Sequence, residues 1–247
     1  MLQEERHRYI LEQITADKRV RTEALSRALA VSVDTVRRDL GELEKSGRLV
    51  RVHGGAIAVD FHTPFQPTEV YAQKEKRRIA RKALSLIRDG MTVLAGGGTV
   101  MLEMARMFPE TLTGAFFTVS PLVALEVAQR SSIEVILISG RLSRSHYICT
   151  GATVLAQVGD IRADLCLMGT NGFAVREGIT EADWEVMQVK KAIIRAAEKT
   201  AVLSIAEKHG IAHRFRVCAI HETDYLITER EPDDPLLSDY NGHCKVL

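Results

Sequence analysis

A short run of residues, 32–40, carries the clearest chemistry in the N-terminal part of the chain. Ser32 can cap a helix, because its hydroxyl accepts hydrogen bonds from backbone N–H groups two or three residues later. Apolar residues at helical spacing would then face a core, and these are Val33, Val36, Leu40 and Leu43. The opposite side can donate to phosphates or read base edges through Asp34, Thr35, Arg37 and Arg38. An amphipathic surface helix explains the run equally well, so the flanking segments decide.

The segments before this run predict two more helices. The first spans 4–16 with an apolar stripe of Ile10, Leu11 and Ile14, and an extended link follows at 19–21. The second begins at Thr22 as its N-cap, with Ala24, Leu25, Ala28 and Leu29 expected to be buried. Only Val31 separates it from Ser32, and so tight a turn makes two helices cross steeply, as in a helix-turn-helix.

The segment after the run predicts a β-hairpin. Gly47 suits the left-handed position past a helix end, and strands at 48–52 and 56–59 flank a turn at 53–55. Three helices and a hairpin make a winged helix, which we assign to residues 1–59. The predicted DNA-binding residues are Thr22, Ser32, Asp34, Thr35, Arg37, Arg38, Arg51 and His53.

The turn sequence His53-Gly54-Gly55 has a competing interpretation, the oxyanion-hole segment of some lipases. That chemistry requires a G-x-S-x-G nucleophile elbow, which the sequence lacks, so the wing is favoured.

Residues 60–73 are predicted to be a linker. Pro64 and Pro67 stiffen it, and neither helical nor strand periodicity is present. Phe61 and Phe65 either dock onto the larger domain or are incidental to the loop.

Residues 74–247 predict an α/β domain with a mainly parallel sheet. The basic helix from Lys74 has an apolar face, so its charges are interpreted as its solvated side. Apolar strands at 91–95, 116–119, 133–138, 165–168, 201–205 and 225–228 follow, with helices near 100–107, 122–129, 153–158 and 183–198. This pattern is typical of a sheet covered on both faces, in which ligands bind beyond the carboxyl ends of the strands.

Small and polar residues gather at those expected strand ends. Gly96-Gly97-Gly98-Thr99 leads from a strand into a helix, where backbone N–H groups would suit an anion such as phosphate. It is neither a Walker loop nor a G-x-G-x-x-G motif. The convergence of several such ends predicts a small polar-ligand site containing Gly97, Gly98, Thr99, Thr118, Ser120, Gly151, Asn171 and Gly172.

The composition is that of a globular protein, with 46% hydrophobic and 26% charged residues in 247. A run of about 20 apolar residues and a signal-peptide pattern are both missing, so we expect a cytoplasmic protein that does not enter the membrane. Because the net charge is only +1, DNA binding must rest on local charge placement. Cys149, Cys166, Cys218 and Cys244 fit reduced, packed thiols.

The sequence resembles the DeoR family of bacterial transcription regulators. The matching segments are Ser32 to Leu40, Gly47, and Arg51-Val52-His53-Gly54-Gly55-Ala56. The resemblance implies a winged-helix operator-binding domain followed by a sugar-phosphate-sensing domain, in a family whose members mostly repress sugar-catabolism genes.

The resemblance extends into the second domain, with departures. Gly97 and Thr99 match the family's phosphate loop, and Lys208 matches the lysine of an Asp-x-Ser-Lys segment, which adds Lys208 to the predicted effector site. Further matches are Gly151, Asp164, Gly169, Gly172, Gly178 and Lys190. Polar family residues are replaced by Ala95, Gly98, Val119, Ile205 and Glu207, and Ser139 stands where a glycine pair usually begins.

The sensor domain is similar to ribose-5-phosphate isomerases, in which acids transfer protons. With Ala95 and Ile205 at two acid positions, a base within reach of the proton is missing, so we predict that the protein is not an enzyme. Glu181 and Asp183 are the acids left near the site, and we interpret both as helix N-terminal acids that complement the dipole.

Two other groups of residues have competing interpretations. His209, His213, Cys218 and His221 have spacing that resembles a zinc site, but Gly210 interrupts the helix that would present both histidines, so we predict no metal. Trp184 could stack on a ligand, and we favour packing or a subunit interface.

We therefore predict a DNA-binding repressor of carbohydrate-metabolism genes without a cofactor. A sugar or sugar phosphate controls it, and a dimer or tetramer is expected because one winged helix contacts one half-site. The alternatives are a sugar-phosphate isomerase with an accessory DNA module, and a constitutive DNA-binding protein whose second domain only oligomerises.

Overall fold

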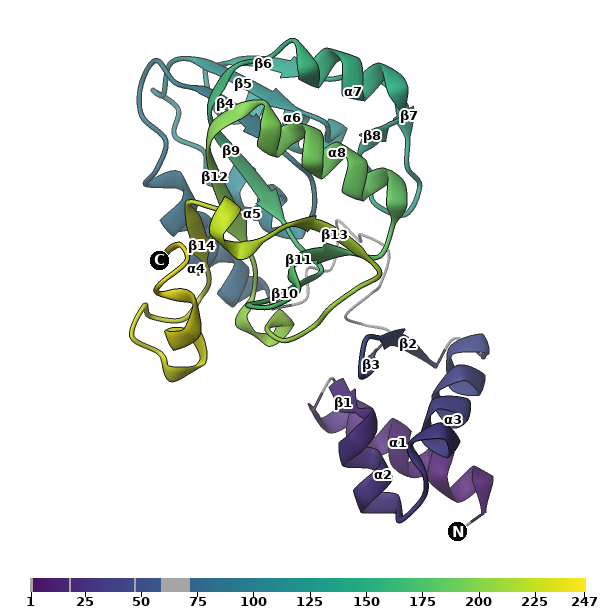
Figure 1. Ribbon diagram of the computed structural model, residues 1–247. Coiled ribbons are helices and arrows are strands. Elements are labelled where there is room, and N and C mark those ends of the chain that lie inside the picture. Colours follow the sequence, from purple (N-terminus) through teal and green to yellow (C-terminus); the bar gives the residue numbers. More distant parts are fainter. Residues whose placement is uncertain (1, 18, 47, 59–71) are drawn as a thin grey trace. The chain divides into compact units, whose positions relative to one another are not determined.

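A computed structural model describes residues 2–17, 19–46, 48–58 and 72–247, which fall into two compact units divided at Thr63 and Pro64 (Figure 1). Each unit is described by itself. Gly47 and nearly all of the linker predicted at 60–73, with both of its phenylalanines and both prolines, lie outside the described residues.

The first unit is a winged helix. Its elements are α1 Gln3–Asp17, β1 Arg19–Arg21, α2 Thr22–Leu29, α3 Val33–Lys45, β2 Leu49–Val52 and β3 Gly55–Ala58. The segment at 19–21, predicted to be a link, is a strand that pairs antiparallel with β3, so the sheet has the order β1-β3-β2. Gly55 makes that pairing possible, because a Cβ there would collide with the backbone carbonyl of Val20.

The core of this unit confirms the predicted periodicity on α1 and α3. Ile10, Val36 and Leu40 are fully enclosed. Ala24 and Ala28 of α2 are exposed, against expectation, and the buried residues of this helix are Thr22, Leu25 and Leu29. A short helix packed on one side has room for only one stripe of buried side chains.

A buried ion pair joins α1 to α3. Asp39 is 1% exposed, and its two carboxylate oxygens accept hydrogen bonds from Arg6 Nε at 2.7 Å and Nη2 at 2.9 Å. A bidentate guanidinium–carboxylate pair fixes direction as well as distance, so it sets the angle at which α1 supports α3.

The turn between α2 and α3 confirms one predicted cap and corrects the other. Ser32 is the N-cap of α3 and its hydroxyl accepts from the Thr35 N–H at 3.1 Å. Thr22 is not a cap: Arg21 holds that position, and Thr22 is the buried first residue of α2, with its N–H donating to the Gly54 carbonyl at 2.8 Å. The hydroxyl of Thr22 is thereby inside the domain, where the wing turn meets α2.

The second unit is built on a parallel seven-stranded sheet with the order β15-β14-β12-β9-β4-β5-β6. Its strands are β4 Thr92–Ala95, β5 Ala115–Thr118, β6 Glu134–Leu137, β9 Ala163–Gly169, β12 Ala197–Leu203, β14 Tyr225–Ile227 and β15 Lys245–Val246. Its helices are α4 Gln73–Leu84, α5 Thr99–Ala105, α6 Pro121–Arg130, α7 Ala152–Gly159 and α8 Trp184–Arg195. The predicted helix at 183–198 ends early, because β12 begins at Ala197.

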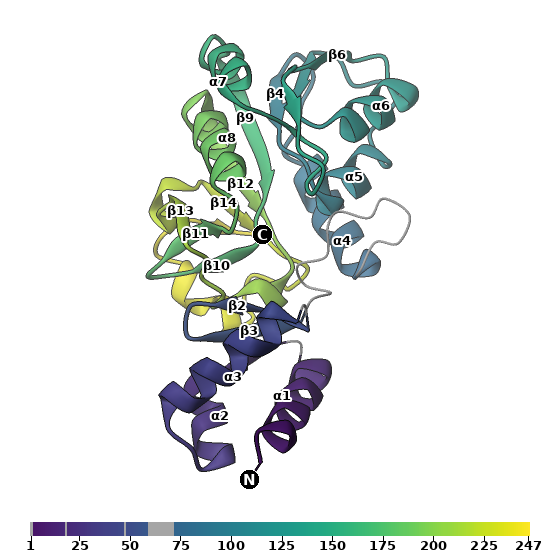
Figure 2. The same cartoon turned by 90° about the vertical axis from the view of Figure 1, so that its right-hand side faces the viewer.

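Alternate residues of each central strand face opposite layers of helices. Val93 and Ala95 pack toward α4, α5 and α6, whereas Leu94 packs toward α7 and α8. Figure 2 shows these two helical layers on either side of the sheet. This is the arrangement predicted for apolar strands in a parallel sheet.

Short strands that the sequence did not reveal surround the carboxyl ends of the sheet. They are β7 Arg141–Leu142, β8 Cys149–Thr150, β10 Gly172–Ala174, β11 Gly178–Glu181 and β13 Phe215–Cys218, and the 3-10 helices are Ala206–Lys208, Ile220–Glu222 and Pro235–Tyr240. β10, β11 and β13 form a separate antiparallel sheet. Strands of two to four residues are too short for alternation to distinguish them from loops.

A second buried acid joins α4 to α5. Glu103 is fully buried and accepts hydrogen bonds from Arg77 at 2.8 Å, Arg106 at 2.8 Å and Gln73 at 3.1 Å. Burial by itself would raise the pKa of Glu103, but these donors outweigh it and lower the pKa.

The Ser32 cap can be tested by exchanging it. Ser32→Ala removes the acceptor and should lower the local stability of α3 by about 1 kcal/mol. Ser32→Asp keeps an acceptor and complements the helix dipole, so it should be close to wild type. Hydrogen–deuterium exchange of α3 amides in the full chain measures both. Equal loss of protection in the two variants would contradict the capping role.

Candidate DNA-binding face and effector site

The exposed side of α3 presents most of the predicted DNA-binding residues together. Arg38 is exposed and has no hydrogen-bond or ion-pair partner within the described part of the chain. Arg37 is also exposed and pairs with Asp34 at 3.0 Å, one helical turn earlier. Solvent-exposed pairs of this kind are weak, so Arg37 can exchange Asp34 for a phosphate or a base at little cost.

The wing places a third arginine beside α3. Arg51, on β2, lies so that one guanidinium nitrogen is 3.5 Å from where a Cβ of Gly41 would be, and its backbone N–H donates to Glu44 at 3.0 Å. His53 is exposed at the β2–β3 turn, where Gly54 takes a φ of +78°. Thr22 alone among the predicted contacts is buried.

The loop after β4 leads from the strand into a helix, as predicted. Gly98 takes a φ of +104° directly before α5, and Gly97, Gly98 and Thr99 are partly exposed. Gly97 also permits a close approach, since a Cβ would collide with the Ile148 side chain. Gly151, with a φ of +101°, precedes α7 in the same way.

Three of the predicted effector residues, Thr118, Ser120 and Gly172, are buried. Thr118 Oγ1 donates to the Gly96 carbonyl at 3.3 Å and accepts from the Ser120 N–H at 3.1 Å. Ser120 Oγ donates to the Tyr147 carbonyl at 3.3 Å. Gly172 lies against the Ile211 backbone, where a Cβ has no room.

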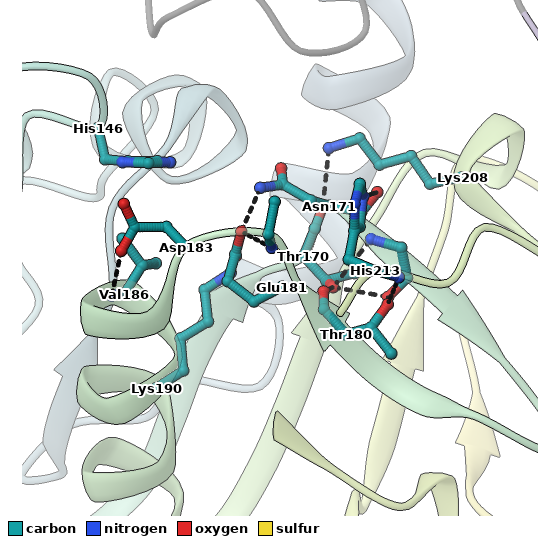
Figure 3. Close-up of polar contacts among 12 residues, drawn as sticks. His146, Thr170, Asn171, Thr180, Glu181, Asp183, Val186, Lys190, Lys208 and His213 are labelled. Atoms are coloured by element: carbon teal, nitrogen blue, oxygen red, sulfur yellow. Dashed lines mark hydrogen bonds and ion pairs between the residues drawn. The ribbon is translucent and has the colours of Figure 1, made fainter. Parts of the chain in front are cut away.

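A polar group lies at the end of β9, and we call it the strand-end cluster: Thr170, Asn171, Glu181, Lys190 and Lys208 (Figure 3). Asn171 Nδ2 donates to Glu181 Oε1 at 2.6 Å, and Lys190 of α8 pairs with the other carboxylate oxygen. Lys208 Nζ donates to the Thr170 carbonyl at 2.8 Å. Residues from β11, from α8 and from the 3-10 helix Ala206–Lys208 therefore meet at the end of β9.

Glu181 has a different role from the one predicted. It lies on β11, is fully buried, and does not begin a helix. Burial by itself would raise the pKa of Glu181, but Lys190 and the Ala182 and Asn171 donors lower it to about 2. Asp183 does cap α8 as expected, accepting from the N–H groups of Glu185 at 2.8 Å and Val186 at 3.1 Å.

Lys208 of the cluster and a second lysine, Lys76, have lowered pKa values. Burial lowers the pKa of Lys208 to about 7, and the positive charges of Lys76 and Lys190 add to the effect. Burial likewise lowers the pKa of Lys76 to about 8, against the opposing effect of Glu103 and other acids. A bound anion would stabilise the charged form of both groups.

Lys76 is a residue that the sequence interpretation missed. Its basic run was assigned to the solvated side of α4, yet Lys76 is 6% exposed. It stands three residues before Ile79 and seven before Ala83, so it shares the buried face of the helix. That spacing was the available signal.

The two histidines of the candidate zinc group make contacts within the fold. His209 lies edge-on to Phe173 with ring centroids 5.8 Å apart, and His213 Nε2 is 3.2 Å from the Asn171 carbonyl oxygen. Across the described ranges, the structure shows no group of three His, Cys, Asp or Glu side chains placed to hold a metal.

Trp184 is 55% exposed and lies edge-on to Phe215. Among helices in the same ranges, none combines the length and apolarity needed to cross a membrane.

Fold and sites together define a class of protein, a helix-turn-helix regulator with an α/β sensor unit. Residues 6–61 match the DeoR-like helix-turn-helix domain, and residues 71–230 match the DeoR C terminal sensor domain. The chain belongs to the DeoR family of transcriptional regulators.

Individual relatives agree over nearly the whole length. The chain is 32% identical to the HTH-type transcriptional repressor GlcR of Bacillus subtilis over 98% of this chain and 95% of the relative. It is 32% identical to the HTH-type transcriptional regulator GlpR of Haloferax volcanii over 93% and 91%. Ribose 5-phosphate isomerase A of Methanocaldococcus jannaschii has a TM-score of 0.41 at 15% identity over 56% of this chain and 55% of that one, a likeness too distant to bear on activity.

The buried pair in the strand-end cluster gives a stability prediction. Glu181→Ala leaves the Lys190 ammonium and the Asn171 amide without their acceptor and should lower the free energy of unfolding by roughly 3 kcal/mol. Glu185→Gln, which loses a surface pair with Arg141, should cost under about 1 kcal/mol. Urea unfolding at neutral pH compares them. Because the pKa of Glu181 is lowered, its contribution is present above about pH 4.5 and is lost as the pH falls toward 2.

Equal losses in the two variants would show that Lys190 finds another partner when Glu181 is removed. Replacing both members of the pair, Glu181→Gln with Lys190→Met, should cost less than Glu181→Ala alone, because no charge then stays buried without compensation.

Proposed function

We propose that this protein represses genes of carbohydrate metabolism by binding operator DNA, and that a sugar or sugar phosphate bound at the strand ends of the second unit changes its affinity for DNA. The observation that carries the effector site is Lys208. Its ammonium lies at the end of β9, close enough to Lys76 and Lys190 for their charges to lower its pKa. Glu181 opposes this shift but is already paired with Lys190, so a bound anion would compensate the positive charge of Lys208.

The DNA-binding part of the proposal rests on α3 and the wing. Arg37 and Arg38 project from the helix that follows the tight turn, and Arg51 lies beside it. This is the disposition in which a winged helix reads the major groove while the wing contacts the backbone. The name of the Bacillus relative supports repression. We include self-association in the proposal, because two half-sites require two winged helices.

The chemistry of the strand ends supports a sensor and not an isomerase. Glu181 is the buried acid of the cluster, and a pKa near 2 makes it a poor proton acceptor at neutral pH. Ala95 and Ile205, at the positions where the family carries acids, are both buried in the hydrophobic core. Binding without proton transfer is what these residues can support.

Arg38 tests the DNA-binding face. Arg38→Ala should weaken operator binding by about 1–3 kcal/mol if the side chain reads a base, or less if it contacts a phosphate. The operator is a duplex selected by the full-length protein from a random library, and fluorescence anisotropy at fixed salt gives Kd. Arg195→Ala, which removes the same charge from the exposed end of α8, should leave Kd unchanged. If both variants bind like wild type, α3 does not read the DNA.

Lys208 tests the effector site. Lys208→Met should abolish both the rise in Tm and the change in operator affinity that sugar phosphates produce, while operator binding without effector is retained. Lys199→Met, at an exposed lysine of β12, is the matched control and should respond like wild type. A Lys208→Met variant that still responds would place the effector elsewhere.

A further inference from the structure

The loop between β7 and β8, residues 143–148, is fixed against the strand ends. The Ser143 N–H donates to the Ile148 carbonyl at 2.8 Å, and the Tyr147 N–H donates to the Ser143 carbonyl at 2.9 Å. Tyr147 takes a φ of +50°, and its carbonyl accepts from Ser120 Oγ. The loop is therefore tied to residues that follow β5, and its side chains have defined directions.

One of those side chains, His146, turns toward the strand-end cluster. Its Nδ1 lies 2.9 Å from Ser145 Oγ, whereas its Nε2 has no hydrogen-bond partner among the described residues. Figure 3 shows the imidazole facing the same space as Asp183 and Asn171. Burial lowers the pKa of His146, with Glu181 and Asp183 opposing that shift and Lys190 adding to it. A neutral imidazole has one donor and one acceptor nitrogen.

Two acceptor oxygens face that space as well. A carboxylate only accepts, so the hydrogen bond from Asn171 Nδ2 to Glu181 fixes the carboxamide, and Oδ1 has no partner among the described residues. Asp183 uses Oδ1 for both of its capping hydrogen bonds, which leaves Oδ2 without a partner in the described part of the chain. The hydrogen bonds to Glu181 and to the N-terminus of α8 fix the orientation of both side chains, and so of these two oxygens.

We propose that His146, Asp183 and Asn171 form a hydroxyl-reading subsite, in which His146 determines which sugar the protein recognises. The inference rests on the proposed function, because the anionic end of the same ligand is assigned to Lys208. Two fixed acceptors beside one imidazole nitrogen match adjacent hydroxyl groups, each of which both donates and accepts. The ligand class is a polyhydroxylated anion whose hydroxyl groups extend from the Lys208 end toward the 143–148 loop.

The experiment uses the full-length protein and isothermal titration calorimetry. The probes are inorganic phosphate, glycerol 3-phosphate and the 6-phosphates of glucose, fructose and galactose, and the tightest sugar phosphate is carried forward. His146→Ala should weaken its binding by about tenfold, the effect of one lost hydrogen bond. Binding of inorganic phosphate should change by less than about twofold, because phosphate does not reach the subsite.

Two further variants separate recognition from folding. His146→Gln retains a polar nitrogen and should recover part of the lost affinity while altering the order of preference among the three hexose phosphates. Arg144→Ala, at an exposed neighbour in the same loop, should bind every probe like wild type. Operator affinity without ligand should be the same in all variants.

The outcomes distinguish this inference from the proposed function. Sugar phosphate binding that needs Lys208 but is indifferent to His146→Ala overturns the subsite alone. Equal weakening of phosphate and sugar phosphate by His146→Ala also overturns it, since the loop would then act only as a structural support. If wild-type protein binds none of the probes, the proposed effector class and the subsite fall together.

Discussion

Within each unit of this protein, buried carboxylates hold neighbouring elements together. Each carboxylate is neutralised by a basic residue from another element. Asp39 fixes α1 on α3, Glu103 fixes α4 on α5, and Glu181 joins β11 to α8 and to the end of β9. A buried charge is tolerated only when it is paired and hydrogen-bonded. Each acid therefore demands one particular geometry, and a fold that failed to supply it would carry an uncompensated charge.

The same kind of buried pair supports the proposed recognition residues in both units. By holding Arg6, Asp39 sets the support under the helix that presents Arg37 and Arg38. By accepting from Asn171, Glu181 fixes the orientation of that carboxamide in the proposed subsite. Neither acid is expected to touch DNA or effector. Asp39 instead fixes the helix that supports α3, and Glu181 fixes the carboxamide of Asn171. In the proposed complexes this lowers the entropy lost on binding.

The departures from the family pattern in the second unit have a shared physical setting. Ala95, Val119 and Ile205 are all buried in hydrophobic clusters on the two sides of the sheet. Apolar side chains there pack against the core and offer a ligand no hydrogen bonds. Polar contacts in the proposed site therefore come from the lysines, from Asn171 and from the loop that carries His146.

Features of local structure that depend on residues close together in the chain were determined by the sequence alone. The Ser32 cap, the apolar stripes of α1 and α3, the alternation of strands and helices and the glycine turns before α5 and α7 all depend on residues within one or two turns of each other. Tertiary structure decided the rest. Arg6 meets Asp39 across 33 positions, and Lys208 meets Thr170 across 38. Glu181 looked like a helix-end acid and Lys76 like a solvated charge, because burial and pairing are set by which elements pack together and leave no local pattern in the sequence.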